Sequence, residues 1–397
     1  MNRKIFYFLV ISFIGFFAIF SSTMSKSPIL PLFAESLIRF ESEIELIGYV
    51  IAASTIPGIL ISMFAGRLSD VYGRKKLLLI STIIFATAPF IYFFAFNLWM
   101  LMIIRFYHGF STAIFIPVAT AAIVESNPEK KGTSISSFSS ITLVGRFFAP
   151  LTGGAILFIT NNYYYGVYIG CAISGTIAFF LTIFLYQNHH HDYDNVKPTD
   201  KKSLTIKEFL KGFKTVLSNK NILTTSIVQA SQYFSFGIIE AYIILFANFL
   251  NFEIWIIGVI PATLTLMLVI LKPIMGFISD KVGRRLIIII GLTLEGVVSL
   301  LISFATNYLW FFVTLCSFGI GMAMVISSTA AHVSDLTKKE DYGAAIGTLS
   351  TIMDIGQTIG PILGGYVLVA LSFKGVFALV GIVLIVSTLI FSFIKNT

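Results

Sequence analysis

Ionisable side chains interrupt several long apolar stretches of this sequence. Between residues 98 and 125, Arg105 and His108 stand three positions apart, and Gly109 follows the histidine. Positions i and i+3 share one face of a helix, so a permanent cation would lie beside an imidazole, a group whose unperturbed pKa lies near neutrality. We interpret this face as a site at which a proton and a substrate compete.

Three other apolar stretches carry polar side chains at helical spacing. The first is interrupted by SSTMSKSP at 21–28, and a polar segment containing proline predicts a locally broken helix that lines water or substrate. Two later stretches each carry one polar stripe, and together the stripes comprise Gln229, Gln232, Tyr233, Phe236, Glu240, Ser350, Asp354 and Gln357. Passive membrane anchors would not need such a polar interior.

Seven charged residues lie inside the apolar stretches, where placing a charge in the membrane costs free energy. They are Lys26, Arg105, Arg146, Glu240, Lys272, Glu295 and Asp354. A charge at the bilayer centre costs roughly 2.5–3.5 kcal/mol even on a lenient insertion scale, so each must face a cavity or a partner. The first half holds Lys26, Arg105 and Arg146, and the second half holds the acids Glu240, Glu295 and Asp354. This favours a cavity with one cationic and one anionic wall, and charge pairing for folding alone is the alternative. Lys272 lies near the inner surface, where it can snorkel.

The elements that hold these residues are membrane-spanning helices. Of 397 residues, 56% are hydrophobic and 12% are charged, and the mean hydropathy is +0.90. A soluble domain carries roughly 25% charged residues, so a soluble globule is excluded. At about 20 residues per span, the chain is long enough for twelve spans and little else. The expected spans are 5–33, 45–66, 77–96, 98–125, 133–159, 163–187, 222–249, 253–276, 286–305, 308–333, 343–371 and 374–394.

The distribution of Lys and Arg predicts the orientation in the membrane. If both termini are cytoplasmic, the inner connections hold 21 of these residues and the outer ones only Arg39 and Lys374. The positive-inside rule therefore predicts a multi-pass protein of the cell (plasma) membrane with both termini in the cytoplasm. The formal charge of +8 forms no basic face, so no nucleic-acid partner is expected.

One long connection divides the chain. We expect a six-helix bundle at 1–188, a cytoplasmic linker at 189–220 and a second six-helix bundle at 221–397. Within the linker, Thr205 and Glu208 form a T-x-x-E capping box, followed by apolar residues on one helical face. This pattern predicts an amphipathic helix on the inner membrane surface.

The two halves repeat one another at an offset of about 210 residues. GRLSDVYGRK at 66–75 matches GFISDKVGRR at 276–285, and GRFFAPLTGG at 145–154 matches GQTIGPILGG at 356–365. Six spans is an even number, so both halves have the same orientation. The pattern predicts parallel repeats about an axis along the membrane normal.

These motifs resemble those of the major facilitator superfamily across essentially the whole chain. The segment 66–75 is similar to the family's G-x-L-[AS]-D-[RK]-x-G-R-[RK] signature, although Val71 replaces a basic residue that Lys281 keeps in the second copy. The segment 105–113 is similar to R-x-x-Q-G-x-x-x-A, with His108 in place of glutamine. The segment 149–154 resembles the G-P-x-x-G-G motif of antiporters, with Ala149 in place of the first glycine.

The resemblance implies an all-α integral membrane fold with 12 transmembrane helices in two six-helix parallel pseudo-repeats. It implies a transporter similar to the 12-span drug/proton antiporters, with a small-molecule substrate, protons and the lipid bilayer as partners. We expect a monomer without a cofactor. In the resembled fold the third helix of each group of three is peripheral, which would place Glu295 away from the transport pathway.

Carboxylates beside the repeated arginines suggest a gate. Asp70 and Asp280 are expected at cytoplasmic helix ends beside Arg74 and Arg284, where a carboxylate can cap a helix and pair with the arginine. We interpret these pairs as contacts that form and break as two bundles rock; a role in topology and fold stability alone is the alternative.

Glycines near these pairs and in two later spans permit close backbone approach or positive φ. The gate set adds Gly66, Gly73, Gly276 and Gly283. The glycine and proline motifs of the fifth and eleventh spans comprise Gly145, Pro150, Gly153, Gly154, Gly360, Pro361, Gly364 and Gly365.

The leading hypothesis is a secondary active transporter working by alternating access, a proton-coupled exporter of small amphipathic molecules or drugs. A proton-coupled importer of a sugar or other metabolite is the alternative. No Walker A motif is present, so ATP is not the expected energy source. No metal motif or nucleophile constellation indicates an enzyme, and the polar stripes disfavour a receptor or structural protein.

The expected substrate and proton pathway comprises Lys26, Arg105, His108, Arg146, Gln229, Gln232, Tyr233, Glu240, Asp354 and Gln357. We expect the proton to be carried by Asp354 or Glu240. Asp354 is preferred because it lies roughly 16 Å into its span, near the midplane. His108 is the next candidate.

Overall fold

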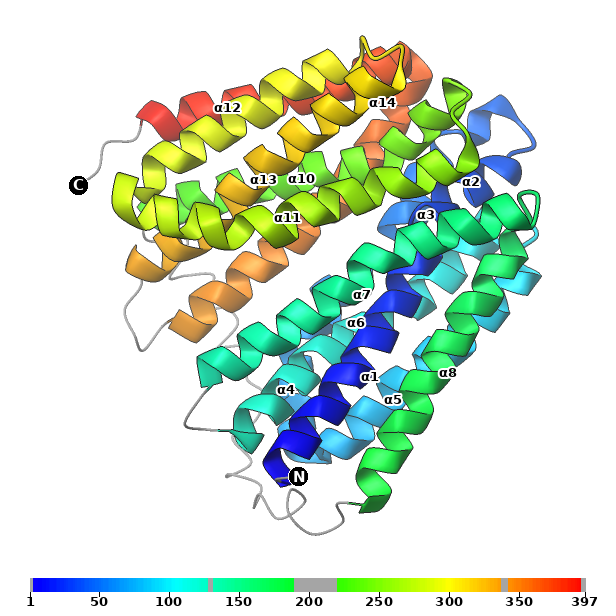
Figure 1. Cartoon of the computed structure of the whole chain (residues 1–397). Helices are drawn as coiled ribbons and strands as arrows, with labels where there is room; N and C mark the ends of the chain where they lie inside the picture. The colour runs from blue at the N-terminus through cyan, green and yellow to red at the C-terminus, as the bar shows by residue number, and fades with distance from the viewer. Residues whose placement is uncertain (1–2, 128–130, 189–219, 337–341, 394–397) are drawn as a thin grey trace. The chain divides into compact units, whose positions relative to one another are not determined.

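The computed structural model describes residues 3–127, 131–188, 220–336 and 342–393. These residues are almost entirely helical, and no β-strand is found among them (Figure 1). The long helices are α1 (Arg3–Lys26), α4 (Ile56–Tyr72), α5 (Arg74–Ile91), α6 (Leu98–Ser126), α7 (Lys131–Ile159), α8 (Tyr164–Asn188), α10 (Lys220–Phe249), α11 (Ile254–Val282), α12 (Arg284–Ile302), α13 (Tyr308–Leu336) and α14 (Tyr342–Phe393). The short ones are α2 (Ile29–Ser36), η1 (Glu41–Glu43), α3 (Leu46–Ala52) and η2 (Tyr92–Phe94).

The described part of the chain has 11 helical segments long and apolar enough to cross a membrane. The last of them, Thr348–Phe393, covers 46 residues and contains Ser372, whose φ of 55° is not helical. This kink separates the last two spans expected from the sequence. The predicted all-α membrane fold with twelve spans is therefore confirmed. The predicted amphipathic helix at 205–217 lies outside the described residues.

Two spans of the first half are interrupted within the membrane region. The helix α1 ends at Lys26 and α2 begins at Ile29, as the polar segment 21–28 predicted. A second interruption separates α3 from α4 at 53–55, which the sequence analysis did not anticipate. At each interruption the backbone is not helical, so nearby side chains can contact a neighbouring helix.

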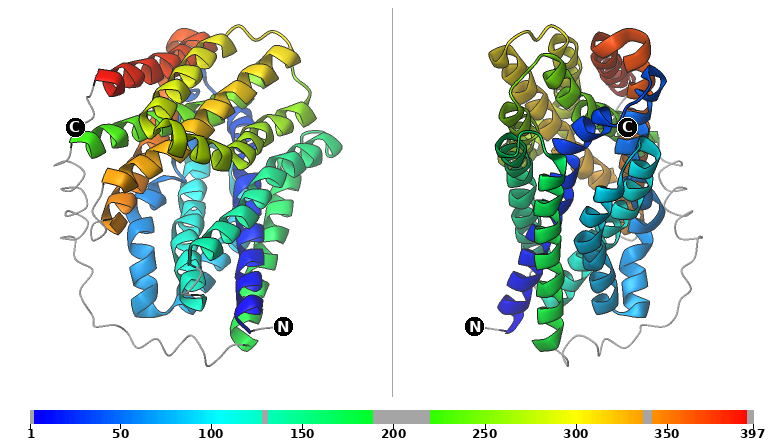
Figure 2. Two further views of the ribbon diagram at one scale, coloured as in Figure 1. Left: turned by 60° about the vertical axis from the view of Figure 1, so that its left-hand side comes forward. Right: turned by 90° about the vertical axis from the view of Figure 1, so that its right-hand side faces the viewer.

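The first compact unit comprises Met1–Leu37, Ala53–Leu204 and Ile254–Ala262. Within it, α1 packs against both α7 and α8, and α5 packs against α6 and α8 (Figure 2). Its apolar core includes Ile11, Phe85 and Phe115, all fully buried. This core holds α6, which carries Arg105 and His108, against α1 and α5.

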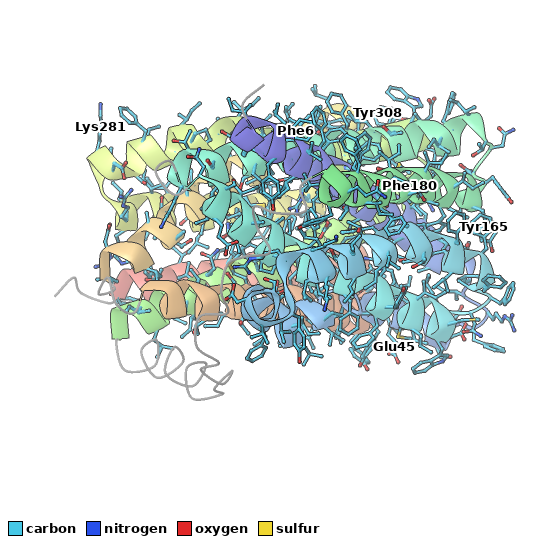
Figure 3. All side chains as sticks on the ribbon, turned by 90° about the horizontal axis from the view of Figure 1, so that it is seen from below. Phe6, Glu45, Tyr165, Phe180, Lys281 and Tyr308 are labelled. Carbon is cyan, nitrogen blue, oxygen red and sulfur yellow. The ribbon has the colours of Figure 1, made fainter. Side chains whose placement is uncertain are left out.

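The second unit comprises Ile38–Ala52, Thr205–Glu253 and Thr263–Thr397. The helix α10 packs along α14, and α12 packs against α13 and α14. Phe246 packs with Phe311 and Phe377, with ring centroids 6.1 and 5.3 Å away. Figure 3 shows Lys281 and Tyr308 toward opposite ends of this unit, which is consistent with α12 running the length between them.

Each unit includes a short segment from the other half of the sequence. The start of α11 belongs to the first unit, where a Cβ added at Gly154 would lie 2.7 Å from Cα of Gly258. The helix α3 belongs to the second unit, where a Cβ added at Gly48 would overlap the carbonyl of Pro361. Glycine is required at both contacts because no side chain fits. The domain bounds 1–188, 189–220 and 221–397 stay a prediction.

Two glycines make the sharp turns at which the repeated motifs lie. Gly73 ends α4 and begins α5 with a φ of 92°, and Gly283 joins α11 to α12 with a φ of 106°. This backbone conformation is costly for residues with a side chain and is readily adopted by glycine. The two turns therefore direct Arg74 and Arg284 into the same local geometry.

Candidate functional site

An arginine cluster lies at the turn between α4 and α5. The Arg74 side chain pairs with Asp70 and with Glu125 of α6, whose Oε1 lies 2.5 Å from Nη2. Its Nη1 donates to the Gly66 carbonyl at 2.7 Å and to the Ser69 hydroxyl. One guanidinium thus joins the ends of α4 and α6 to the start of α5.

The same cluster recurs at the turn between α11 and α12. Arg284 pairs with Asp280, lies 3.3 Å from Oδ2 of Asp335 on α13, and donates to the Ser279 hydroxyl at 2.9 Å. In both units the second acid follows the arginine by 51 residues. Glu125 and Asp335 were not predicted from the sequence, and this equal separation was the signal that could have identified them.

These clusters are only partly shielded from solvent. The two arginine side chains are 15% and 22% exposed, and their aspartate partners Asp70 and Asp280 are 47% and 56% exposed. An exposed ion pair contributes about 0–1 kcal/mol, so each pair can break at small cost. The Asp–Arg pairs expected from the sequence are present, and their role as a gate stays a prediction.

The other two glycines of the gate set have no structural need to be glycine in this conformation. A Cβ added at Gly66 or Gly276 would meet no atom of the described residues within 4 Å, and neither residue has a positive φ. The close-approach argument is therefore wrong for this pair. It holds only for the turn glycines and for those in the helix contacts.

Arg105 is a buried cation held by hydroxyl groups. Its Nη1 donates to the Tyr92 hydroxyl at 3.1 Å and to the Ser25 hydroxyl at 3.4 Å, and its Nη2 donates to the Ser54 hydroxyl at 2.7 Å. The residue is 3% exposed, and within the described chain no carboxylate pairs with it and Nε has no hydrogen-bond partner. A buried charge without a counter-ion is costly, so this cluster is a candidate functional site.

Tyr92 connects Arg105 to the histidine on the same helix face. The Tyr92 hydroxyl lies 3.2 Å from Nδ1 of His108, and its ring stacks on Tyr168 at a centroid distance of 4.1 Å. Across the described residues, His108 Nε2 and the Tyr168 hydroxyl are buried without a hydrogen-bond partner. The sequence predicted the Arg105–His108 face, but not the tyrosines that complete it.

The interruptions in the first two spans position the hydroxyls around Arg105. Ser25 lies in the last turn of α1, and Ser54 lies between α3 and α4. A Cβ added at Gly109 would overlap the Ser54 carbonyl, so this glycine lets Ser54 reach the surface of α6. Gly109 of the predicted motif therefore serves the geometry of the Arg105 cluster.

Two further predicted pathway cations lie on α1 and α7. Lys26 is the last residue of α1 and is half-buried. Arg146 lies on α7 with an exposed side chain. Their place in the pathway stays a prediction.

In the second unit, the two glutamines of the predicted α10 stripe are buried. The Gln229 side-chain oxygen accepts from the Thr329 hydroxyl. The Gln232 amide donates to Oε1 of Glu295 at 3.1 Å and to the Met322 carbonyl at 3.3 Å. These bonds connect α10 with α12 and α13.

The two polar stripes meet where α10 contacts α14. Oε2 of Glu240 accepts from the Gln357 amide at 3.3 Å. Asp354 lies less than one turn before Gln357 and is half-buried, as is Tyr233. Glu240 and Gln357 were predicted on separate spans, and the structure brings them together.

Glu295 was expected to be peripheral, and that expectation is wrong for its side chain. The residue is 0% exposed and contacts α10 through Gln232. The helix α12 can have a lipid-facing side while its opposite face packs inward, and Glu295 lies on the inward face. Its type alone, an acid in an apolar span, was the available signal.

The glycine and proline motifs are sites of close helix contact. On α7, a Cβ added at Gly145 would lie 2.8 Å from the Phe16 carbonyl oxygen of α1. On α14, a Cβ at Gly360 would overlap the Phe234 carbonyl of α10, and the Tyr242 hydroxyl donates to the Pro361 carbonyl at 2.6 Å. Further close contacts are made by Gly153, Gly154, Gly364 and Gly365.

The family model of the Major Facilitator Superfamily matches residues 11–270 and 256–397. The chain belongs to this superfamily. As a member of the major facilitator superfamily, it is a transporter of small molecules across a membrane, and the family and transporter-named relatives indicate a transporter, not an enzyme.

Relatives of this superfamily member carry names that refer to multidrug resistance. The chain is 26% identical over 398 residues to the multi-drug resistance efflux pump PmrA homolog of Lactococcus lactis subsp. lactis, covering 98% of this chain and 94% of the relative. It is 27% identical to the multidrug resistance protein MdtG of Proteus mirabilis, covering 88% and 86%.

Solved structures of other transporters share the fold. The nucleoside transporter NupG matches with a TM-score of 0.80 at 15% identity, over 99% of this chain and 98% of that one. A bacterial homolog of the human lysosomal transporter Spinster matches with a TM-score of 0.76 at 14% identity, over 98% and 95%. At these identities the similarity shows the fold alone.

Proposed function

We propose that the protein is a proton-coupled secondary transporter that exports small amphipathic molecules or drugs by alternating access. The observation that carries this proposal is the Arg105 cluster. A guanidinium buried among neutral hydroxyls, with no carboxylate partner in the described chain, is costly to keep in the fold. Such a group is suited to interact with a substrate or with a proton that enters the site.

The direction of transport is supported by the relatives. Of the two described above, one is named a multi-drug resistance efflux pump and the other a multidrug resistance protein, and both are covered over most of their length. Within the predicted antiporter-like motif at 149–154, Gly153 lies close to Met24 and Gly154 close to Gly258. Export of a substrate in exchange for protons is the function that these observations favour.

The proposal includes the pathway, the orientation and the oligomeric state. Protons and substrate interact with Arg105 and His108 in the first unit and with Glu240 and Asp354 in the second. Both termini lie in the cytoplasm, since the Lys and Arg residues gather on the connections of that side. The protein acts as a monomer.

Liposomes that contain the full-length purified protein test this proposal. With the lumen acidic, an antiporter accumulates an added amphipathic dye such as ethidium, and a protonophore abolishes the accumulation. Antiport accumulates substrate when the lumen is acidic, and symport does so when the outside is acidic. The direction of the pH gradient therefore distinguishes the two mechanisms in either orientation of the protein. Accumulation only when the outside is acidic, with a sugar or nucleoside in place of the dye, would favour the importer alternative.

A further inference from the structure

The Glu295 side chain lies in an enclosed polar contact with α10 and α13. Glu295 and Gln232 are both 0% exposed, and Nε2 of Gln232 lies 3.1 Å from Oε1 of Glu295. The same Nε2 donates to the Met322 carbonyl at 3.3 Å. A backbone carbonyl can only accept, so this bond sets which end of the Gln232 amide faces Met322.

Two oxygen atoms in this contact have no hydrogen-bond partner. Within the described chain, Oε2 of Glu295 and Oε1 of Gln232 are buried and unsatisfied. A carboxylate and an amide oxygen are both acceptors only, so the ionised Glu295 cannot form a hydrogen bond with Oε1 of Gln232. A proton on Oε2 of Glu295 supplies the missing donor. A neutral acid and an amide can then form a reciprocal pair, in which one proton satisfies both oxygens.

The charged groups around Glu295 bear on which of its protonation states is stable. In the described chain Glu295 has no ion pair, and Gln232 is its side-chain partner. The other titratable and charged residues on α12 and on the helices packed around it are Lys220, Tyr233, Glu240 and Tyr242 on α10, Arg284 and Arg285 on α12, Tyr308, Cys316, His332 and Asp335 on α13, and Tyr342, Asp354, Tyr366 and Lys374 on α14. A buried carboxylate with one neutral donor is costly, so this environment favours the neutral acid.

The local packing is shaped to the acid. A Cβ added at Gly321 of α13 would lie 2.6 Å from Cγ of Glu295, and one added at Gly291 would lie 2.9 Å from the Gly321 carbonyl oxygen. These two glycines let α12 and α13 approach closely where the carboxyl group enters. Glu295 therefore occupies a fitted position.

We propose that Glu295, held by Gln232, is a proton-binding site that couples transport to the pH gradient. The proposal rests on the proposed function and adds an acid to those on the α10 and α14 stripes. Binding forms the Oε2–H bond, and release returns that proton to water when the acid–amide pair opens. Polar groups continue from the site along α10 and α13, through the Gln229–Thr329 bond and the buried hydroxyl of Ser328.

Glu295→Gln is the most informative variant. A second amide can donate to Oε1 of Gln232 as the neutral acid does, so the fold is preserved while proton release is removed. Glu253→Gln is the matched control, because Glu253 is an exposed glutamate at the start of α11. Both variants are made in the full-length chain and reconstituted in liposomes.

The first measurement is infrared difference spectroscopy at neutral pH. We expect the C=O stretching band of a protonated carboxylic acid in the wild type and in Glu253→Gln, and loss of intensity in this band in Glu295→Gln. Identical bands in all three proteins would show that Glu295 is ionised and would overturn the proposal.

The second measurement compares gradient-driven accumulation of ethidium with exchange of ethidium across the membrane without a gradient. For Glu295→Gln we expect accumulation to fall at least tenfold while exchange is retained. Full retention of both activities, or equal loss of both, would overturn the proposal. If the wild type itself shows no gradient-driven transport, the proposed function fails, and the infrared result still decides whether Glu295 holds a proton.

Discussion

The buried side chains of this protein show how a charge can be kept in a membrane without a permanent counter-ion. Three hydroxyls from α1, η2 and the segment between α3 and α4 bond to Arg105. Hydroxyls solvate the guanidinium but do not neutralise it. The cation therefore keeps an attraction for an incoming anionic group, and the adjacent His108 shares the same tyrosine partner.

Replacing Arg105 tests this arrangement directly. Arg105→Lys offers its donors from a single nitrogen and cannot reproduce the spacing of Nη1 and Nη2, and Arg105→Ala removes all three bonds. Bonds to charged groups contribute about 1.5–3 kcal/mol each, so we expect transport of ethidium to fall roughly tenfold or more in both variants. The control is Arg39→Ala, at an exposed arginine. Near-normal flux of the Arg105 variants at every pH would contradict the role of this site.

The acids of the second unit are tested by amide substitution. We expect Asp354→Asn to remove the dependence of transport on the pH gradient and to retain exchange of substrate for substrate, because an amide cannot carry a proton. Glu240→Gln is compared in the same flux assay. If both variants keep full gradient-driven accumulation, neither acid is the carrier, and His108 is the next of the predicted residues to test.

At the scale of helices, breaks and turns position the polar groups. The interruption after α1 and the one between α3 and α4 bring Ser25 and Ser54 to Arg105. The positive-φ turns at Gly73 and Gly283 place an arginine at the first position of the following helix in each half. These breaks and turns are local departures from regular helix, and each lies beside a charged side chain.

Gly73→Ala is expected to destabilise the fold. Forcing an alanine to a φ of 92° costs about 1–2 kcal/mol. We expect a lower melting temperature in detergent than for the wild type. Gly132→Ala is the matched control, since Gly132 is helical and exposed, and alanine there should gain up to about 1 kcal/mol of helix propensity. Equal melting temperatures for the two variants would show that the Gly73 turn relaxes freely.

At the scale of the whole molecule, the duplication of the sequence is a duplication of structure. Each unit has one arginine that pairs with an acid four residues earlier and with a second acid on a later helix. The interiors differ, because the first unit buries Arg105 and the second buries Glu295. The halves have thus kept the same ionic clusters at their turns and diverged in the charges of their cores.

The clusters at the turns are expected to control the rate of transport. We predict that Asp70→Asn and Arg74→Ala slow ethidium flux several-fold and leave its binding nearly unchanged. The reason is that this cluster lies at the turn between α4 and α5, whereas Arg105 lies within α6. Binding is measured by fluorescence titration of the purified protein and flux in liposomes. A loss of binding as large as the loss of flux would refute the gate.

Much of this architecture followed from the order of residues alone. Hydropathy located the spans, the repeated GRLSDVYGRK-like segments revealed two related halves, and the polar segment 21–28 predicted the break in the first span. These features are readable because they depend on neighbours along one helix. Hydropathy and local backbone preference determine these features, and contacts between helices are not needed.

Only the tertiary structure decided which side chains complete each cluster. Tyr92 bridges Arg105 and His108 from a different helix, Glu125 joins Arg74 over 51 residues, and Gln232 reaches Glu295 over 63. A contact between helices depends on their relative rotation and closest approach, which packing of side chains and glycines determines. A helix expected at the periphery therefore holds a fully buried acid, because one face of α12 packs inward and that face carries Glu295.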